Sequence, residues 1–179
     1  MIILQKNNSK NSTIRGKKST FVQNKTTIMQ NIETVLKLED EIAIIEAVGT
    51  HIWDKKEKTD LNKAELTFVY VDIFEAAMNE GGLHYFFDNE SGDFAAEIIQ
   101  AYKDINATKT ATLLTKAFQL FTVKYTTNTE DRKKVIEKMD EKIISGWEDL
   151  DEMFFTEEEE DVVNLIVEFI RKNKTKFMN

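Results

Sequence analysis

The sequence predicts an all-α protein, a single compact domain of about eight helices with a Gly-Gly and aromatic turn in the middle. Apolar residues recur at three- and four-residue spacing through most of the chain, and no alternating run is long enough for a confident strand. The 179 residues contain no proline, although average usage of about 5% would give roughly nine. Because proline breaks helix interiors, its absence favours helices, with codon bias as an equal alternative explanation.

The first predicted helices lie before the turn. Residues 32–53 carry apolar side chains at helical spacing, and Gly49 is expected to bend or split that helix. A charged connection leads to a helix over residues 62–79, which Asp60 or Asn62 can cap. This second helix is apolar enough to be the central, most buried one. Only its segment 67–72 is ambiguous between helix and strand.

Residues 78–93 are the most informative stretch, because three of the six glycines fall there around a dense aromatic patch. Glycine loses more conformational freedom on folding than any other residue. A pair such as Gly81 and Gly82 directly after a helical pattern therefore indicates that the backbone needs a positive φ or a close approach.

Further helices are predicted after the turn. Ser91 is a candidate N-cap for a helix over residues 92–104, and Asn106 marks its C-terminal break because Asn tolerates left-handed geometry. Thr108 can then cap a helix over residues 109–121. The remaining predicted helices run from the loop 126–129 to Met139, over residues 147–155 after Gly146, and from a capping box of Thr156 and Glu159 to residue 172.

The net charge of −8 hides a division of the chain. Residues 1–27 hold six basic residues and no acidic one, so the remainder holds 18 basic and 32 acidic residues, a net of −14. These first residues are rich in Asn, Ser, Thr and Lys with little to bury, which predicts a flexible basic tail over residues 1–28 and an all-α domain over residues 29–179. A basic tail can bind nucleic acid. Two alternative explanations of these residues are an unselected leader and a true translation start at Met29.

Several classes of function are disfavoured by composition. The chain has no cysteine, which excludes disulfides, thiolate catalysis and thiolate metal sites. No apolar run approaches the ~18 residues that span a bilayer, so we expect a cytoplasmic protein without membrane contact. No serine has a nucleophile-elbow context and the Gly-Gly pair lacks a phosphate-binding motif. We therefore expect no enzymatic activity and no cofactor.

Three motifs carry a resemblance to a known family. They are a helix end followed by an aromatic turn, an Ile-x-Ala before a Leu-rich helix, and a late Leu-Asp-x-x-Phe element. Here they read Asn79-Glu80-Gly81-Gly82-Leu83 with Phe86, Asn89 and Gly92; Ile105-Asn106-Ala107; and Leu150-Asp151-Glu152-Met153-Phe154. In these motifs, residues 38–172 resemble the all-α domain of unknown function of the neisserial DNA-mimic protein family.

The resemblance implies a non-enzymatic acidic protein-binding domain, a DNA mimic that occupies basic surfaces of DNA-binding or regulatory proteins. Its partner would be a basic protein, and the folded domain would not bind nucleic acid directly. Glu80 and Leu83 replace the Asn and Phe that are usual in the family. A fold alone does not transfer a binding surface. The motif residues for which a structural role is expected are Asn79, Gly81, Gly82, Phe86, Asn89 and Gly92.

Residues 148–161 form the candidate partner-binding surface, because they hold nine carboxylates and no basic residue. Acidic groups one helical turn apart are separated by ~5–6 Å, the same order as the 3.4 Å rise between phosphates of one DNA strand. The alternative is structural, since carboxylates favour the positive end of a helix macrodipole. The nine residues are Glu148, Asp149, Asp151, Glu152, Glu157, Glu158, Glu159, Glu160 and Asp161.

The two histidines, His51 and His84, are the usual first candidates for proton transfer or metal binding. His84 could pair with Asp88 near Asp93, but a metal site would need scattered carboxylates without recognisable spacing. We therefore expect structural histidines and no metal site.

A set of aromatic residues could line a groove for a partner, although aromatic residues at helical spacing more often belong to the core. Two alternative functions also stay open. One is a toxin-neutralising, immunity-type interaction protein, and the other is a ligand-binding or enzymatic domain around His84. The aromatic set is Tyr85, Phe86, Phe87, Phe94 and Tyr102.

Overall fold

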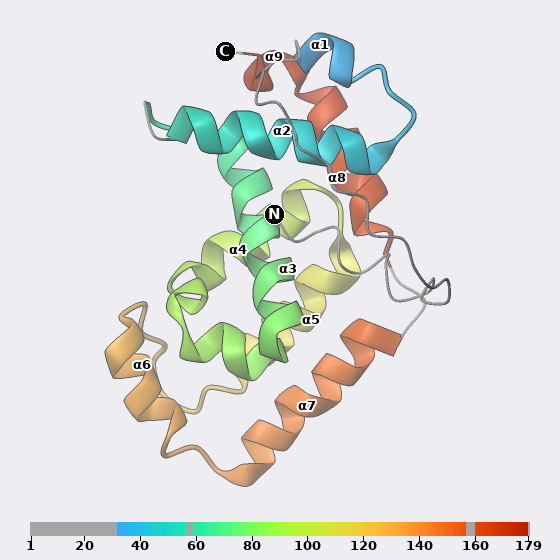
Figure 1. Ribbon diagram of the computed structural model, residues 1–179. Coiled ribbons are helices and arrows are strands. Elements are labelled where there is room, and N and C mark those ends of the chain that lie inside the picture. The colour runs from blue at the N-terminus through green and yellow to red at the C-terminus, as the bar shows by residue number, and fades with distance from the viewer. Residues whose placement is uncertain (1–31, 57–58, 157–159, 179) are drawn as a thin grey trace, which may run out of the picture.

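The computed structural model describes residues 32–56, 59–156 and 160–178 (Figure 1). These residues contain nine α-helices, one 3₁₀ helix and no strand, which confirms the predicted all-α fold. The predicted tail, residues 1–28, lies outside them. The elements are α1 (Ile32–Val35), α2 (Glu41–Lys56), α3 (Lys63–Asp88), the 3₁₀ helix η2 (Glu90–Phe94), α4 (Ala95–Asp104), α5 (Thr108–Gln119), α6 (Thr129–Ile136), α7 (Glu141–Thr156), α8 (Val162–Lys172) and α9 (Lys174–Phe177).

Helix α3 is the central element, as its apolar composition predicts. It contacts α2, α4, α6, α7 and α9 as well as η2. Its start is a capping box, in which the side chain of Asn62 accepts from the backbone N–H of Glu65 and the Glu65 carboxylate accepts from the backbone N–H of Asn62. Of the two predicted caps, Asn62 is therefore confirmed. The ambiguous segment 67–72 is helical.

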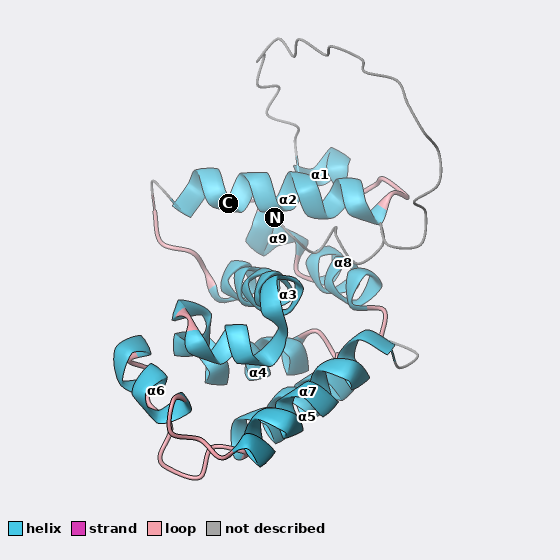
Figure 2. Cartoon of the chain, turned by 60° about the horizontal axis from the view of Figure 1, so that its bottom comes forward, coloured by secondary structure: helices cyan, strands magenta, loops and turns pink. Residues whose placement is uncertain are grey.

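The other helices pack at the two ends of α3. Helices α1, α2, α8 and α9 lie together at one end, at the top of Figure 1, where α2 packs against both α1 and α8. Helices α4 and α7 also pack against α3, and α5 packs against both α4 and α7. Figure 2 shows α5 and α7 side by side, with α6 at the edge of the same group.

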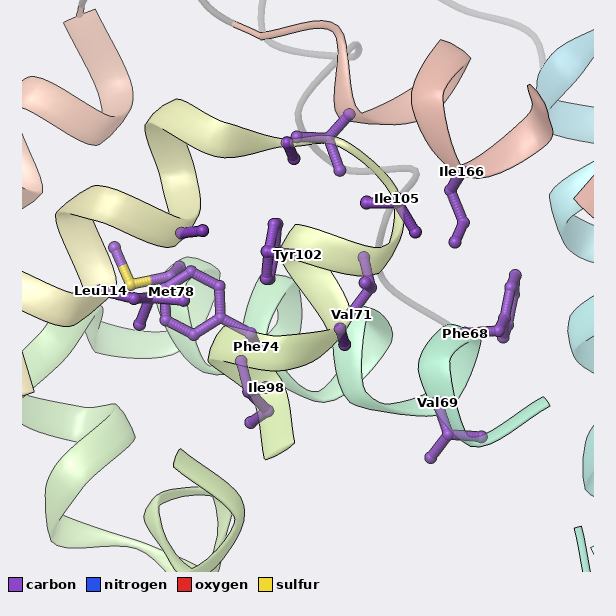
Figure 3. Packing of buried hydrophobic residues seen from close by; sticks show 14 of the residues in the cluster. Phe68, Val69, Val71, Phe74, Met78, Ile98, Tyr102, Ile105, Leu114 and Ile166 are labelled. Atoms are coloured by element: carbon purple, nitrogen blue, oxygen red, sulfur yellow. The ribbon is translucent and has the colours of Figure 1, made fainter. Parts of the chain in front are cut away.

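The core is built around the rings that α3 carries inward. Figure 3 shows Phe74 of α3 close to Tyr102 of α4, among buried aliphatic side chains of neighbouring helices. The Phe74 ring meets Phe86, Tyr102 and Phe154 in edge-to-face geometry, at centroid distances of 5.1, 5.5 and 5.7 Å. This geometry is the favoured one for aromatic pairs, and it ties α3, α4 and α7 together.

Some predicted boundaries are wrong. The helix predicted over residues 32–53 is two helices, because the chain leaves α1 and Asp40 then accepts from two backbone amides of the first turn of α2. Gly49 lies inside α2 without a break, so the predicted bend or split there is wrong. Gly146 lies inside α7, so the helix predicted over residues 147–155 begins earlier, at Glu141. The predicted break at Asn106 is confirmed by its φ of 65°.

Three predicted helix caps are also wrong. Ser91 lies within η2, and its hydroxyl donates to a backbone carbonyl of α3. Thr108 lies inside α5, and Thr156 is the last residue of α7. The cap of α8 is Asp161, whose carboxylate accepts from the backbone N–H of Asn164 at 3.0 Å.

Candidate functional site

A kink in α3 at the Gly-Gly pair positions the most specific contact of this region. Gly82 has φ 68° and ψ −158°, a combination open essentially to glycine alone, which confirms the predicted positive φ, whereas Gly81 is extended. After the kink, the backbone N–H of Leu83 donates to the carboxylate of Asp151 on α7 at 2.9 Å. A Cβ atom on Gly82 would lie 2.3 Å from Asp151 Oδ2. The glycine therefore permits the approach through which Asp151 caps the second segment of α3.

Ionisation of Asp151 is less favourable in the folded protein than for an ordinary aspartate. Burial raises the pKa of its carboxyl group above the ordinary value, and the negative charge of Glu148 adds to that. The hydrogen bond from Leu83 and the proximity of His84 lower this pKa, but the net shift is upward. Because the pKa of this carboxyl group is higher in the folded protein than in the unfolded chain, its ionisation opposes folding. The free energy of unfolding therefore falls as the pH rises through the interval between those two pKa values.

Replacing Asp151 with asparagine should preserve folding, because the amide oxygen can still accept from Leu83. Asp151→Ala removes the acceptor and should cost about 1 kcal/mol of unfolding free energy. Urea melts at acidic and neutral pH test both points. Relative to wild type, Asp151→Asn should gain stability as the pH rises, since it lacks the partly buried charge. Equal stability of the asparagine and alanine variants at both pH values would contradict the capping role.

Glu160 holds the start of α5 in a similar way. Its Oε1 accepts from the backbone N–H of Lys109 at 2.6 Å, and its Oε2 accepts from that of Thr110 at 2.9 Å. The N-cap position of α5 is Ala107, which has no side chain able to cap. Glu160 therefore supplies, from the segment before α8, the cap that the sequence assigns to Thr108.

The nine candidate carboxylates consequently form three groups. The first group holds the N-termini of helices, the second lies outside the described residues, and the third is exposed on α7. Only the third group is both described and free of a backbone-capping bond in this structure. In that order, the groups are Asp151, Glu160 and Asp161; Glu157, Glu158 and Glu159; and Glu148, Asp149 and Glu152.

Further carboxylates are directed into the core. Glu65 pairs with Lys55 at 2.8 Å, and Glu75 accepts a 2.8 Å hydrogen bond from the hydroxyl of Tyr102. Burial, together with the charge and the hydrogen bond of Glu75, raises the pKa of the Tyr102 hydroxyl well above its ordinary value. Asp72 is also buried. The acidity of the sequence therefore overstates the number of carboxylates available to a partner.

Arg132 is a fully buried side chain that the sequence reasoning missed. Its Nε donates to the carbonyl of Phe87 at 2.5 Å, and its Nη2 donates to that of Asn89 at 2.6 Å. Its Nη1 donates to the carbonyl of Thr126 and lies 2.8 Å from a carboxylate oxygen of Asp93. The guanidinium thus satisfies the backbone at the C-terminus of α3 and neutralises a neighbouring carboxylate.

The other family-motif residues lie around the two ends of the second segment of α3. The side-chain amides of Asn79 and Asn89 each donate to a carbonyl one turn earlier, and Phe86 is buried in the core. The carbonyl of Gly92 accepts from the hydroxyl of Tyr125 at 2.6 Å. A Cβ atom on Gly92 would lie 2.8 Å from the Arg132 guanidinium, so a close approach is required there as well.

The two histidines are placed on different helices. His84 is exposed on α3 and meets the ring of Trp147 edge-on, at a centroid distance of 6.2 Å. His51 lies on α2, and its buried Nε2 has no hydrogen-bond partner among the described residues. Within the described ranges, no three His, Cys, Asp or Glu side chains are grouped as ligands for a metal ion.

The aromatic set divides between core and surface. Phe86, Phe87 and Tyr102 are fully buried, whereas Tyr85 is 40% and Phe94 39% exposed. The two exposed rings face one wide groove of about 1170 Å³, formed by α3, η2 and the start of α6. The groove-lining carboxylates are Glu80, Glu90, Asp93 and Glu130, and Lys133 is the one basic residue among the described residues that line it.

Comparison with known proteins gives a match to a family model. A family model described as "DMP19-like protein" matches residues 59–173, from just before α3 to just after α8. No curated protein and no solved structure matches the chain. No helix of the described part is long and apolar enough to cross a membrane. The matched segment covers more than half of the sequence, and it includes the kink, Asp151, Arg132 and the groove. The resemblance drawn from the three motifs is thereby confirmed, and the chain belongs to the DMP19-like family of DNA-mimic proteins.

Proposed function

We propose that this chain is a non-enzymatic acidic binding protein, a DNA mimic that occupies the basic surface of a DNA-binding or regulatory protein. Family membership supports this proposal, and the observation that carries it is the exposed acidic face of α7. Glu148, Asp149 and Glu152 are exposed there, and no basic residue follows Lys142 in that helix. Glu148 and Glu152 are one turn apart, a spacing of ~5–6 Å that a basic groove built for phosphates can accept.

The cap role of Asp151 fixes the position of this face. Because Asp151 ties α7 to the kinked segment of α3, the neighbouring carboxylates project from a packed helix. Charges held in a fixed array lose little entropy on binding, so a preorganised acidic face binds better than the same charges on a mobile chain. Glu157, Glu158 and Glu159 belong to the same proposed surface by sequence, although they lie outside the described residues.

Neutralising the exposed face should weaken binding of a basic partner at unchanged stability. In Glu148→Gln/Asp149→Asn/Glu152→Gln, three charges are removed while Asp151 keeps its cap. Exposed charges act over about 8–10 Å near physiological ionic strength, so the main effect should be slower association, by about tenfold at low salt. A partner is first captured from the native lysate at two salt concentrations, and its association kinetics are then measured with each variant.

A matched control removes three exposed carboxylates elsewhere, in Glu46→Gln/Asp54→Asn/Glu168→Gln on α2 and α8. This control has the same net charge and should associate nearly as fast as wild type. Mimicry further requires that the wild-type chain displaces duplex DNA from the partner. A partner that binds equally well with or without duplex DNA would overturn mimicry in favour of another interaction role. Equal kinetics for the two triple variants would remove the α7 face from the proposal.

A further inference from the structure

The groove between α3, η2 and α6 combines exposed aromatic side chains with a surplus of negative charge. Tyr85 and Phe94 line it and are each about two-fifths exposed to solvent, and the ring of Phe94 lies 5.7 Å from the ring of Tyr70. Among the described residues that line the groove, there are four carboxylates and one basic residue, Lys133. Exposed aromatic area favours contact with a partner, and the surplus of negative charge selects the sign of that partner.

The carboxylates of the groove are not equivalent. Asp93 is already engaged, because it accepts from the hydroxyl of Thr129 at 2.9 Å and pairs with the buried Arg132. Glu130 lies 3.9 Å from Lys133, in an exposed pair that contributes little to stability. Glu80 and Glu90 are both exposed; Glu80 precedes Tyr85 in the sequence, and Glu90 lies between Tyr85 and Phe94. The groove therefore offers exposed carboxylates next to two aromatic faces.

We infer that this groove is a docking site for an arginine-bearing segment of the partner protein. A guanidinium is planar, stacks on tyrosine and phenylalanine faces, and donates two parallel hydrogen bonds to a carboxylate. A lysine ammonium matches only the charge. Phosphate groups are repelled by the carboxylates, so nucleic acid does not fit the groove. The inference rests on the proposed function for the basic character of the partner, but it places the contact on a surface separate from α7.

Binding of short peptides to the full chain tests this inference. The probes are a fluorescein-labelled peptide of alternating arginine and alanine and its lysine counterpart, measured by fluorescence anisotropy at low salt. Glu90→Gln/Glu130→Gln should weaken binding of the arginine peptide by about fivefold or more, since two exposed charges beside the aromatic rings are lost. Tyr85→Leu keeps the apolar bulk but removes one aromatic face, and it should reduce the preference for arginine over lysine.

The matched control is Glu46→Gln/Glu168→Gln, which removes two exposed charges from α2 and α8 and should change peptide affinity by less than about twofold. Equal losses in the two double variants would overturn the groove in favour of the general field of the protein. Equal binding of the arginine and lysine peptides by wild type would overturn the guanidinium specificity. A synthetic peptide of residues 1–27, which carries six basic residues, serves as competitor. If the competitor binds with higher affinity than the arginine peptide, a partner segment is overturned as the occupant in favour of the chain's own N-terminal segment.

The groove variants and the α7 triple variant separate this inference from the proposed function when the captured partner replaces the peptide. Loss of partner binding in the α7 triple variant with unchanged partner binding in the groove variants would overturn the groove and leave the proposed function standing. Loss of partner binding in the groove variants alone would support the groove and remove the α7 face from the proposed function.

Discussion

Replacing Arg132 with methionine should lower the free energy of unfolding by about 3–5 kcal/mol, the range for breaking a buried ion pair by removing one partner. Methionine fills similar volume, so the loss reports the guanidinium. It leaves the carbonyls of Phe87, Asn89 and Thr126 without their donor, and Asp93 without its counter-charge. Urea denaturation monitored by the buried Trp147 measures the effect.

Two controls separate charge from contact. Lys134→Met removes one positive charge from the exposed face of α6 and should leave the midpoint of unfolding unchanged. Asp93→Asn keeps the groove shape but leaves the guanidinium buried without its carboxylate, and the double variant with Arg132→Met should lose less than the two single losses added together. Strict additivity, or a stability loss for Arg132→Met no larger than that of Lys134→Met, would contradict the assigned role.

Arg132 also links the fold to the groove. The residues that it holds, Asn89 and Asp93, line the groove together with the exposed rings. A partly destabilised Arg132→Lys variant should therefore bind the arginine peptide more weakly than its remaining folded fraction accounts for. Lysine donates from one nitrogen and cannot reproduce the three-way fork, so the groove wall loses its fixed position.

The helical architecture was predictable from local patterns, because helices depend on contacts three and four residues apart. The cap at Asn62, the break at Asn106 and the central position of α3 all follow from side chains close in sequence. The same logic predicted a positive φ at the Gly-Gly pair. It did not predict that α3 would continue beyond the pair, since the second segment is held by Asp151 of α7, 68 residues away.

The candidate site was less predictable, because long-range contacts decide which charges are free. Asp151, Glu160 and Glu148 look alike in an acidic run, yet the first two cap helices from distant segments and only Glu148 is exposed without such a bond. Arg132 lies in a run of charged residues on a short helix, which is typical of a solvated face, and it is fully buried. A sequence pattern gives the charge of a residue, and its tertiary partners decide what that charge does.

Replacing Gly82 with alanine should destabilise the protein by about 3 kcal/mol or more, through two separate effects. The first is the backbone, since φ 68° with ψ −158° is strained for any residue with a Cβ atom. The second is the overlap of that atom with the Asp151 carboxylate, at 2.3 Å. Denaturant melts measure the loss, and Gly146→Ala is the control, because its Cβ atom would meet only the end of the Leu120 side chain at 3.0 Å within a regular helix.

A double-mutant cycle divides the two effects. Asp151→Ala removes the carboxylate that the new methyl group would meet, so in its background Gly82→Ala should cost only the backbone strain, about 1–3 kcal/mol. The difference between the two costs is the steric term, and it should be at least about 1 kcal/mol for an overlap of this size. If Gly82→Ala costs the same with and without Asp151, the carboxylate does not approach the kink as closely as described. If it costs nothing in either background, the kink itself is not required. A larger cost of Gly82→Ala in wild type than in the Asp151→Ala background would mean that the Gly-Gly motif permits the close approach of α7 to α3. The same approach fixes the direction of the exposed carboxylates Glu148 and Glu152.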